Sequence, residues 1–143
     1  TSSVFTLGDA VTVNTNTEAY IAYLFSEKQG FSKFGSYLGN GDADGTFVYL
    51  GFRPAWVMIK GTGGTTNWHI YDDQRLGYNV DNNSQRANLA TVDQTDDDID
   101  LLSNGFKIRR NTSALATSGG DYIYAAFAKA PLVNSNGVPC NAK

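Results

Sequence analysis

The sequence has little charge of either sign and few basic side chains. Charged residues make up 17% of the 143 residues, and eleven Lys and Arg against fourteen Asp and Glu leave a net charge of −3. Scattered basic residues on an acidic chain provide no positive field for gripping phosphates. No apolar run approaches the ~18 residues that cross a bilayer. We therefore expect no nucleic-acid partner and no membrane insertion.

Cysteine and histidine each occur once, which narrows the possible chemistry. Cys140 has no second cysteine for an internal disulfide. A catalytic triad would have to use His69, with Asp72 or Asp73 as its orienting acid, yet the chain lacks the Gly-x-Ser-x-Gly turn that presents a nucleophilic serine. Two glutamates in the whole chain are also few for the general acid of glycoside hydrolysis. The expectation is that the protein is not an enzyme.

Helix formers are scarce, whereas turn formers are abundant. Fifteen Gly, thirteen Asn and twelve Asp interrupt short segments that are rich in aromatic and β-branched residues. This alternation of turn signals and short strands is typical of an all-β sandwich or barrel. The sequence therefore predicts one antiparallel β-sandwich, of jelly-roll or lectin-like type, over residues 1–130, and a C-terminal tail over residues 131–143. Because residue 1 is Thr1, we expect either a processed product or a section of a longer polypeptide.

Several segments have the pattern of individual strands. Residues 55–60 are the longest, and Pro54 should stand at the first position of that strand because proline cannot donate to a ladder. Two antiparallel pairs are predicted from strands joined by short turn-forming loops. These pairs are 31–37 with 46–51, around the loop 40–45, and 99–102 with 105–109, through Ser103 and Asn104. Further short strands are expected at residues 4–13 and 68–71. The polar stretch 76–91 is expected to be either a long excursion or an edge strand at 87–90.

Two segments, Tyr20 to Phe25 and Tyr122 to Ala128, are apolar on both sides of an extended chain. A strand at the centre of a sandwich is covered on both faces, so it reads as a continuous apolar run. The two segments also resemble each other in sequence. We therefore predict that both are central core strands and neighbours in one sheet.

Aromatic residues are the first candidates for a binding site. They make up 13% of the chain, and an exposed tyrosine or tryptophan offers a flat apolar face with a polar group, which suits stacking on sugar rings. Tyr37, Tyr71 and Tyr78 border Gly, Asn and Asp clusters, so they are expected to be more exposed than the tyrosines of the strands. Arg75 completes the predicted ligand-binding set. Alternatively, Arg75 forms a structural ion pair with Asp72.

Acidic loops are the second candidates, for a metal. Asn40, Asp42 and Asp44 followed by Gly45 have the spacing of the first half of a calcium loop. The position of the completing bidentate glutamate is occupied by Gly51, so a simple hairpin loop is the main alternative. A second acidic run, 96–98 with Asp93 and Asp100, is better explained as solvated loop carboxylates, because consecutive carboxylates on a strand point to opposite faces.

Several longer motifs follow one another along the chain: YIAYLF at 20–25, FSKFGSY at 31–37 with GNG at 39–41, VYLGFRPAWVMIK at 48–60, NWHIYD at 67–72 with Arg75, LSNGFKI at 102–108, and YIYAAFA at 122–128. Their order resembles a domain that recurs in tail proteins of marine bacteriophages. The similarity spans nearly the whole chain.

This resemblance implies a virion protein, located outside the cell on a tail fibre or related appendage, that attaches to the host surface through a glycan or a surface protein. It implies no catalytic residues, no cofactor beyond the calcium considered above, and other virion subunits as partners. Fibre proteins are commonly trimers, so the resemblance also implies a homo-oligomer. The variable loops 40–46, 61–66, 78–86 and 111–119 would form the contact surface. The positions typical of the family would be structural, namely Trp56, Trp68, Asp72, Arg75 and Phe106.

Three alternatives stay open from the sequence. The first is a purely structural virion or decoration domain without receptor binding. The second is an enzyme that trims surface polysaccharide with a pair of aspartates. The third is a carbohydrate-binding module of a secreted bacterial protein.

Overall fold

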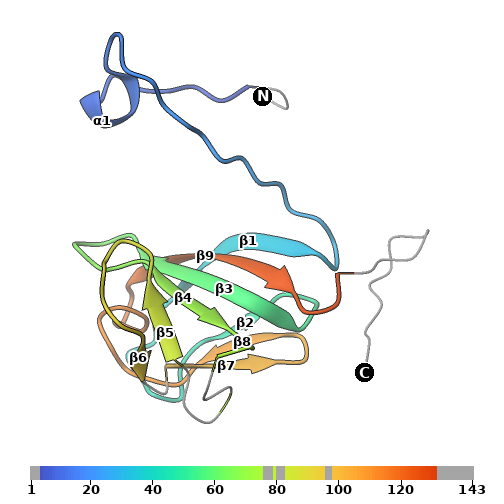
Figure 1. Cartoon of the computed structure of the whole chain (residues 1–143). Coiled ribbons are helices and arrows are strands. Elements are labelled where there is room, and N and C mark those ends of the chain that lie inside the picture. The colour runs from blue at the N-terminus through green and yellow to red at the C-terminus, as the bar shows by residue number, and fades with distance from the viewer. Residues whose placement is uncertain (1–3, 76–78, 80–82, 96–97, 132–143) are drawn as a thin grey trace.

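A computed structural model shows two antiparallel sheets packed face to face, and it describes residues 4–75, 79, 83–95 and 98–131 (Figure 1). The six-stranded sheet has the order β1 (Ser32–Leu38), β9 (Asp121–Ala128), β3 (Pro54–Gly61), β4 (His69–Asp72), β5 (Asn83–Arg86) and β6 (Gln94–Thr95). The three-stranded sheet has the order β2 (Phe47–Tyr49), β8 (Gly105–Ile108) and β7 (Ile99–Leu102). The predicted all-β sandwich is confirmed.

The core lies between the two sheets and is filled by alternate residues of each strand. On β3, Val57 and Ile59 are fully buried, whereas the residues that alternate with them point to the other side of the sheet. Phe106 of β8 meets the six-stranded sheet from below, with its ring centroid 6.2 Å from that of Tyr37 and 5.5 Å from that of Tyr124. The loop that follows β8 adds Leu115 to the same core.

The strands with the clearest patterns lie where the sequence predicted them. Pro54 is the first residue of β3, and Trp68–Tyr71 overlaps β4. β7 and β8 form the predicted hairpin, with Ile99 opposite Ile108 and Leu102 opposite Gly105. β9 is a central strand between β1 and β3.

The predicted pairing of residues 31–37 with 46–51 is wrong. These segments form β1 and β2, which belong to different sheets, because β1 pairs with β9 and β2 pairs with β8. The loop between them therefore crosses from one sheet to the other. The expected edge strand at residues 87–90 is also displaced: the strand is β5, at Asn83–Arg86, and residues 87–89 form a turn.

The prediction of a central core strand at Tyr20 to Phe25 is wrong as well. Residues 4–27, here called the N-terminal arm, contain no strand; their one regular element is a single helical turn, α1 (Val11–Asn14), which also replaces the strands expected at 4–13. The arm leaves the start of β1 and extends away above the six-stranded sheet (Figure 1). Most of its large apolar side chains are exposed, with Ile21 and Tyr23 the most exposed of them.

The strands of the two sheets lie between Ser32 and Ala128. The predicted tail, apart from residue 131, lies outside the described residues, as does Cys140. Among the residues that the structure describes, no helix is long and apolar enough to span a membrane.

Candidate functional site

Tyr37 and Tyr71 are core residues, so their predicted exposure is wrong. Tyr37 stacks on Tyr122 with ring centroids 5.1 Å apart, and its hydroxyl donates to the carbonyl oxygen of Leu115 at 2.9 Å. Tyr71 is completely buried, and its hydroxyl donates to Asp98 Oδ2 at 2.8 Å. Both lie on strand positions that point between the sheets, which outweighs the polar residues next to them in the sequence. Tyr78 lies outside the described residues.

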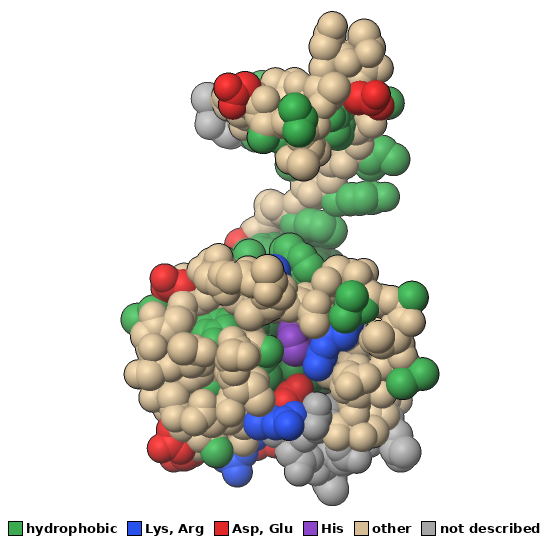
Figure 2. Space-filling view, turned by 90° about the vertical axis from the view of Figure 1, so that its left-hand side faces the viewer, with side chains coloured by type: hydrophobic (Ala, Val, Ile, Leu, Met, Phe, Trp, Pro, Cys, Tyr) green, Lys and Arg blue, Asp and Glu red, His purple; other side chains and the backbone are tan. Residues whose placement is uncertain are grey.

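A buried polar network surrounds Tyr71 and joins the two sheets. Asp98, just before β7, accepts the Tyr71 hydroxyl and lies 3.5 Å from the guanidinium of Arg110. His69 Nδ1 lies 2.5 Å from Arg86 Nη1 and 3.3 Å from the Tyr71 hydroxyl. Figure 2 shows the single histidine at the back of a hollow in the end of the sandwich, between basic and acidic side chains.

This network does not have the geometry of a catalytic triad. An arginine guanidinium can only donate, so Nδ1 of His69 is the acceptor in its bond with Arg86 and carries no proton for an orienting carboxylate. The acids considered from the sequence point elsewhere: Asp72 binds Arg75, and Asp73 forms an ion pair with Lys129 at 2.6 Å. We interpret the network as a structural link between the two sheets.

Arg75 forms the structural ion pair that the sequence offered as its alternative role. Its Nε donates to Asp72 Oδ2 at 2.7 Å, and its Nη1 donates to Asp93 Oδ2 at 2.5 Å. Arg75 thereby ties the end of β4 to the segment before β6. A role of Arg75 in ligand binding stays a prediction.

The acidic loop at 40–45 is closed by its own side chains. Asn40 Oδ1 accepts the backbone N–H of Asp42, and Asp42 Oδ1 accepts that of Asp44. The carboxylate of Asp44 is 2.5 Å from the ammonium of Lys107, and this hydrogen bond, followed by the charge of Lys107, lowers the pKa of Asp44. Among the described residues, no three His, Cys, Asp or Glu side chains are grouped to hold a metal ion. We therefore expect this closed loop not to bind calcium.

Thermal unfolding with calcium and with a chelator tests that prediction. A ligand that binds only the folded state raises the melting temperature. Because the loop oxygens already accept hydrogen bonds or pair with Lys107, we expect the same melting temperature in both conditions. A rise that Asp42→Ala abolishes would show that the loop opens to bind the ion.

An exposed tyrosine stands beside a polar hollow at the junction of the two sheets. Tyr49, the last residue of β2, is 60% exposed, and the ammonium of Lys33 lies 5.4 Å from its ring centroid and donates to its carbonyl oxygen at 3.1 Å. The hollow has a volume of about 540 Å³. Its lining includes charged and amide groups that precede or begin β1, namely Glu27, Lys28, Gln29 and Lys33.

The backbone around Tyr49 is held rigidly. Gly51 has a φ of +82°, a conformation that side chains rarely adopt, and this glycine turns the chain beside the Tyr49 ring. The amides of Leu50 and Gly51 both donate to the carbonyl oxygen of Asn104, at 2.9 and 3.1 Å. The Tyr49 ring is thus carried by backbone that is hydrogen-bonded to the neighbouring hairpin, as binding residues on sandwich edges commonly are.

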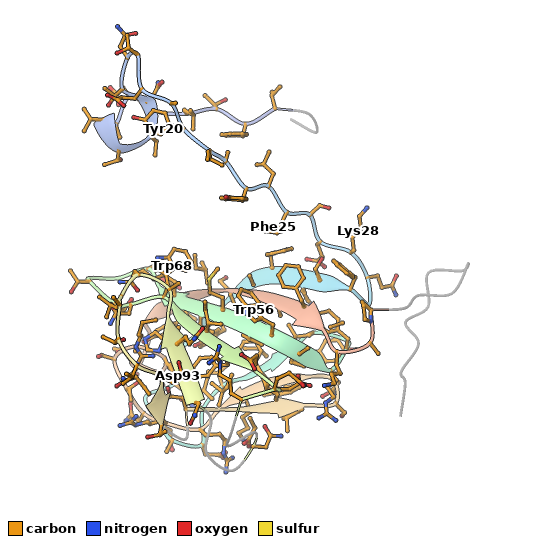
Figure 3. The ribbon with its side chains drawn as sticks, viewed as in Figure 1. Tyr20, Phe25, Lys28, Trp56, Trp68 and Asp93 are labelled. Carbon is orange, nitrogen blue, oxygen red and sulfur yellow. The ribbon has the colours of Figure 1, made fainter. Side chains whose placement is uncertain are left out.

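A second hollow is almost wholly apolar and lies on the outer face of the six-stranded sheet. It has a volume of about 480 Å³. Phe34 of β1, Trp56 and Met58 of β3, and Trp68 before β4 contribute side chains to it, and Phe25 of the arm closes one end (Figure 3). This surface is here called the apolar groove.

The family comparison adds one assignment. Residues 1–131 match a domain of unknown function, DUF7483. The chain belongs to this family. No curated protein and no solved structure matches the chain.

Neither surface hollow of this DUF7483 domain was predicted from the sequence. The signal for Tyr49 was present, because Val48 is a core residue and its neighbours on a strand must point outward. The two tryptophans, expected to be structural, lie on the groove side of the sheet. Of the predicted contact loops, 78–86 lies partly outside the described residues, and residues 83–86 form the strand β5.

Proposed function

We propose that this DUF7483 domain is a bacteriophage virion domain, on a tail fibre or related appendage, that attaches the particle to a host surface glycan through the hollow beside Tyr49. The observation that carries the proposal is the exposed Tyr49 ring at the edge of a polar hollow. The likeness of the sequence motifs to phage tail domains supports the virion setting.

The chemistry of the hollow suits a sugar better than an apolar ligand. A sugar ring has an apolar face, which can stack on an aromatic ring, and hydroxyl groups around its edge. Tyr49 offers the ring, while Glu27 can accept and Lys33 can donate hydrogen bonds to hydroxyls. A single stack of this kind is weak, so several copies on one particle would supply the avidity that adhesion needs.

Glycan-array and whole-cell binding by the purified chain test the proposal. We expect Tyr49→Ala to weaken binding by about tenfold, since an aromatic contact contributes about 0.5–1.5 kcal/mol beyond its buried area. Phe47→Ala is the matched control, because Phe47 is a second exposed ring on β2 and does not line the hollow. Equal loss of binding in both variants would contradict the assignment of the site.

Absence of binding to any glycan or host cell would contradict attachment as the function. That result would favour the alternative of a purely structural virion domain, for which the exposed arm and the apolar groove are the supporting observations. The genes on either side of the coding sequence would separate a virion protein from a secreted carbohydrate-binding module.

A further inference from the structure

The outer face of the six-stranded sheet is apolar where a sandwich normally presents polar side chains to water. One row of paired residues crosses four neighbouring strands: Phe34, Ala125, Met58 and Ile70. The next row places Trp56 opposite Phe127, with their ring centroids 5.6 Å apart. An open sheet face of this composition marks a surface that another chain segment covers.

The arm of the same protein has the complementary character. Residues 19–26 carry no charge. Ile21 is 82% and Tyr23 is 80% exposed, and Leu24 on the other side of the extended chain is also exposed. Figures 1 and 3 show this part of the arm pointing away from the sheet. Ile21, Tyr23 and Leu24 therefore present apolar surface to water in the single chain.

One residue of the arm already shows that the groove accepts this segment. The ring of Phe25 lies at the end of the groove, 6.0 Å from the Phe34 ring and 5.9 Å from the Phe127 ring. The remaining groove, toward Trp56 and Trp68, is free of arm residues. Both surfaces are uncharged and rich in aromatic and aliphatic groups, so they match in chemistry.

We propose that residues 19–24 of one copy of the chain lie in the apolar groove of a second copy, while Phe25 stays at the end of its own groove. Beyond Phe25 the arm runs away from its own sheet (Figure 1), so Ile21, Tyr23 and Leu24 are exposed and the rest of the groove is open. A second copy offers a groove to the arm and an arm to the groove, and this contact removes apolar surface of both from water. Arm and groove are different surfaces, so the contact closes into a ring of copies or into a dimer that exchanges arms.

This proposal stands apart from glycan attachment, because the apolar groove and the hollow beside Tyr49 share no lining residue. Sedimentation velocity over a range of concentrations measures it directly. We expect the native chain to form an oligomer and the variant Ile21→Asp with Tyr23→Asp to be a monomer, since burying two carboxylates in an apolar groove is strongly unfavourable. Both side chains are exposed in the single chain, so the variant should fold.

Val92→Asp is the matched control for this experiment. Val92 is 83% exposed, like Ile21, and it belongs to a loop of the sandwich far along the chain from the arm. We expect this variant to stay oligomeric. A native chain that is monomeric at every concentration, or an arm variant that associates as well as the control, would overturn the proposal.

Engineered cysteines separate contact between copies from contact within one copy. In a Cys140→Ser background, one chain carries Tyr23→Cys and another carries Met58→Cys. We expect a mixed disulfide dimer after mild oxidation of the two chains together, and none when Val92→Cys replaces Tyr23→Cys. Disulfide formation only when both cysteines are placed in the same chain would overturn the proposal and show that the arm folds onto its own groove.

Discussion

Replacing Gly105 by alanine should lower the free energy of unfolding by about 3 kcal/mol, at the upper end of the usual cost of overpacking a core. Gly105 opens β8, where it lies opposite Tyr49 of β2 and Leu102 of β7. A Cβ atom at this position would overlap the carbonyl oxygen of Val48 and approach the Phe47 ring to 3.1 Å. The carbonyl belongs to the backbone of the adjacent strand, so no side-chain rotation relieves the overlap.

Gly63→Ala is the control for this prediction. Gly63 lies in the loop after β3, its φ is not in the left-handed region, and a Cβ atom there meets nothing within 4 Å. Urea unfolding curves of the two variants provide the measurement. Equal midpoints for Gly63→Ala, Gly105→Ala and the native chain would show that β2 and β8 are not packed as closely as described.

The same substitution connects the core to the candidate site. Because β2 carries Tyr49, moving β2 away from β8 displaces the ring from the polar hollow. Gly105→Ala should therefore reduce both stability and glycan binding, whereas Tyr49→Ala should reduce binding alone. The pair of variants distinguishes a contact made by the ring from an effect of a loosened sheet.

The strands that could be predicted are those whose pattern is local. Residues 55–60 and 105–109 alternate between core and outer positions, and turn residues bound them closely, so their type and position follow from the sequence. Pairing is different, because it depends on contacts between distant segments. β1 pairs with β9, about ninety residues later, and nothing in either strand specifies that partner over the nearer β2.

An apolar run indicates that both of its faces are covered but does not say by what. Tyr122 to Ala128 and Tyr20 to Phe25 have nearly the same character, yet the first is the central strand β9 and the second is an exposed arm. In β9 one face lies in the core and the other lines the apolar groove. A partner outside the single chain cannot be read from composition.

The candidate site was missed for a related reason. Polar neighbours in the sequence predict that Tyr37 and Tyr71 are exposed. The register of each strand, however, fixes the side of the sheet to which each side chain points. Tyr37 lies opposite Tyr122 and Tyr71 opposite Val57, all on the core side. Tyr49 alternates with a core valine, so the parity of a short strand predicts exposure better than its flanking loops do.

Two of the buried tyrosines, Tyr37 and Tyr71, should make the fold sensitive to alkali. Burial, and to a lesser degree the neighbouring Tyr122, holds the pKa of Tyr37 far above its ordinary value of 10.0. Burial raises the pKa of Tyr71 in the same way, with the Asp98 carboxylate adding to the effect. In the unfolded chain both hydroxyls ionise near pH 10, whereas in the folded protein they stay protonated. Their contribution to stability is therefore complete below about pH 10 and is lost as the pH rises toward their folded-state pKa values.

The expected slope is large enough to unfold the domain within a few pH units. Each of these two tyrosines should lower the free energy of unfolding by about 1.4 kcal/mol per pH unit above about pH 10. Together they lower it by about 2.7 kcal/mol per pH unit. Small domains are stable by about 5–15 kcal/mol in total. Urea unfolding at intervals between about pH 9 and about pH 12, with tyrosinate absorbance recorded in parallel, measures the slope.

Tyr37→Phe tests whether the slope comes from these residues. The variant loses the bond to the Leu115 carbonyl and should be less stable near neutral pH by about 1 kcal/mol, but its loss of stability per pH unit should be smaller than that of the native chain by about 1.4 kcal/mol. The slope is independent of the neutral-pH difference, so a poorly packed variant still gives a clear answer. A native chain with constant stability above about pH 10, or a variant with an unchanged slope, would mean that water reaches the Tyr37 hydroxyl and that the two sheets are not closed over it.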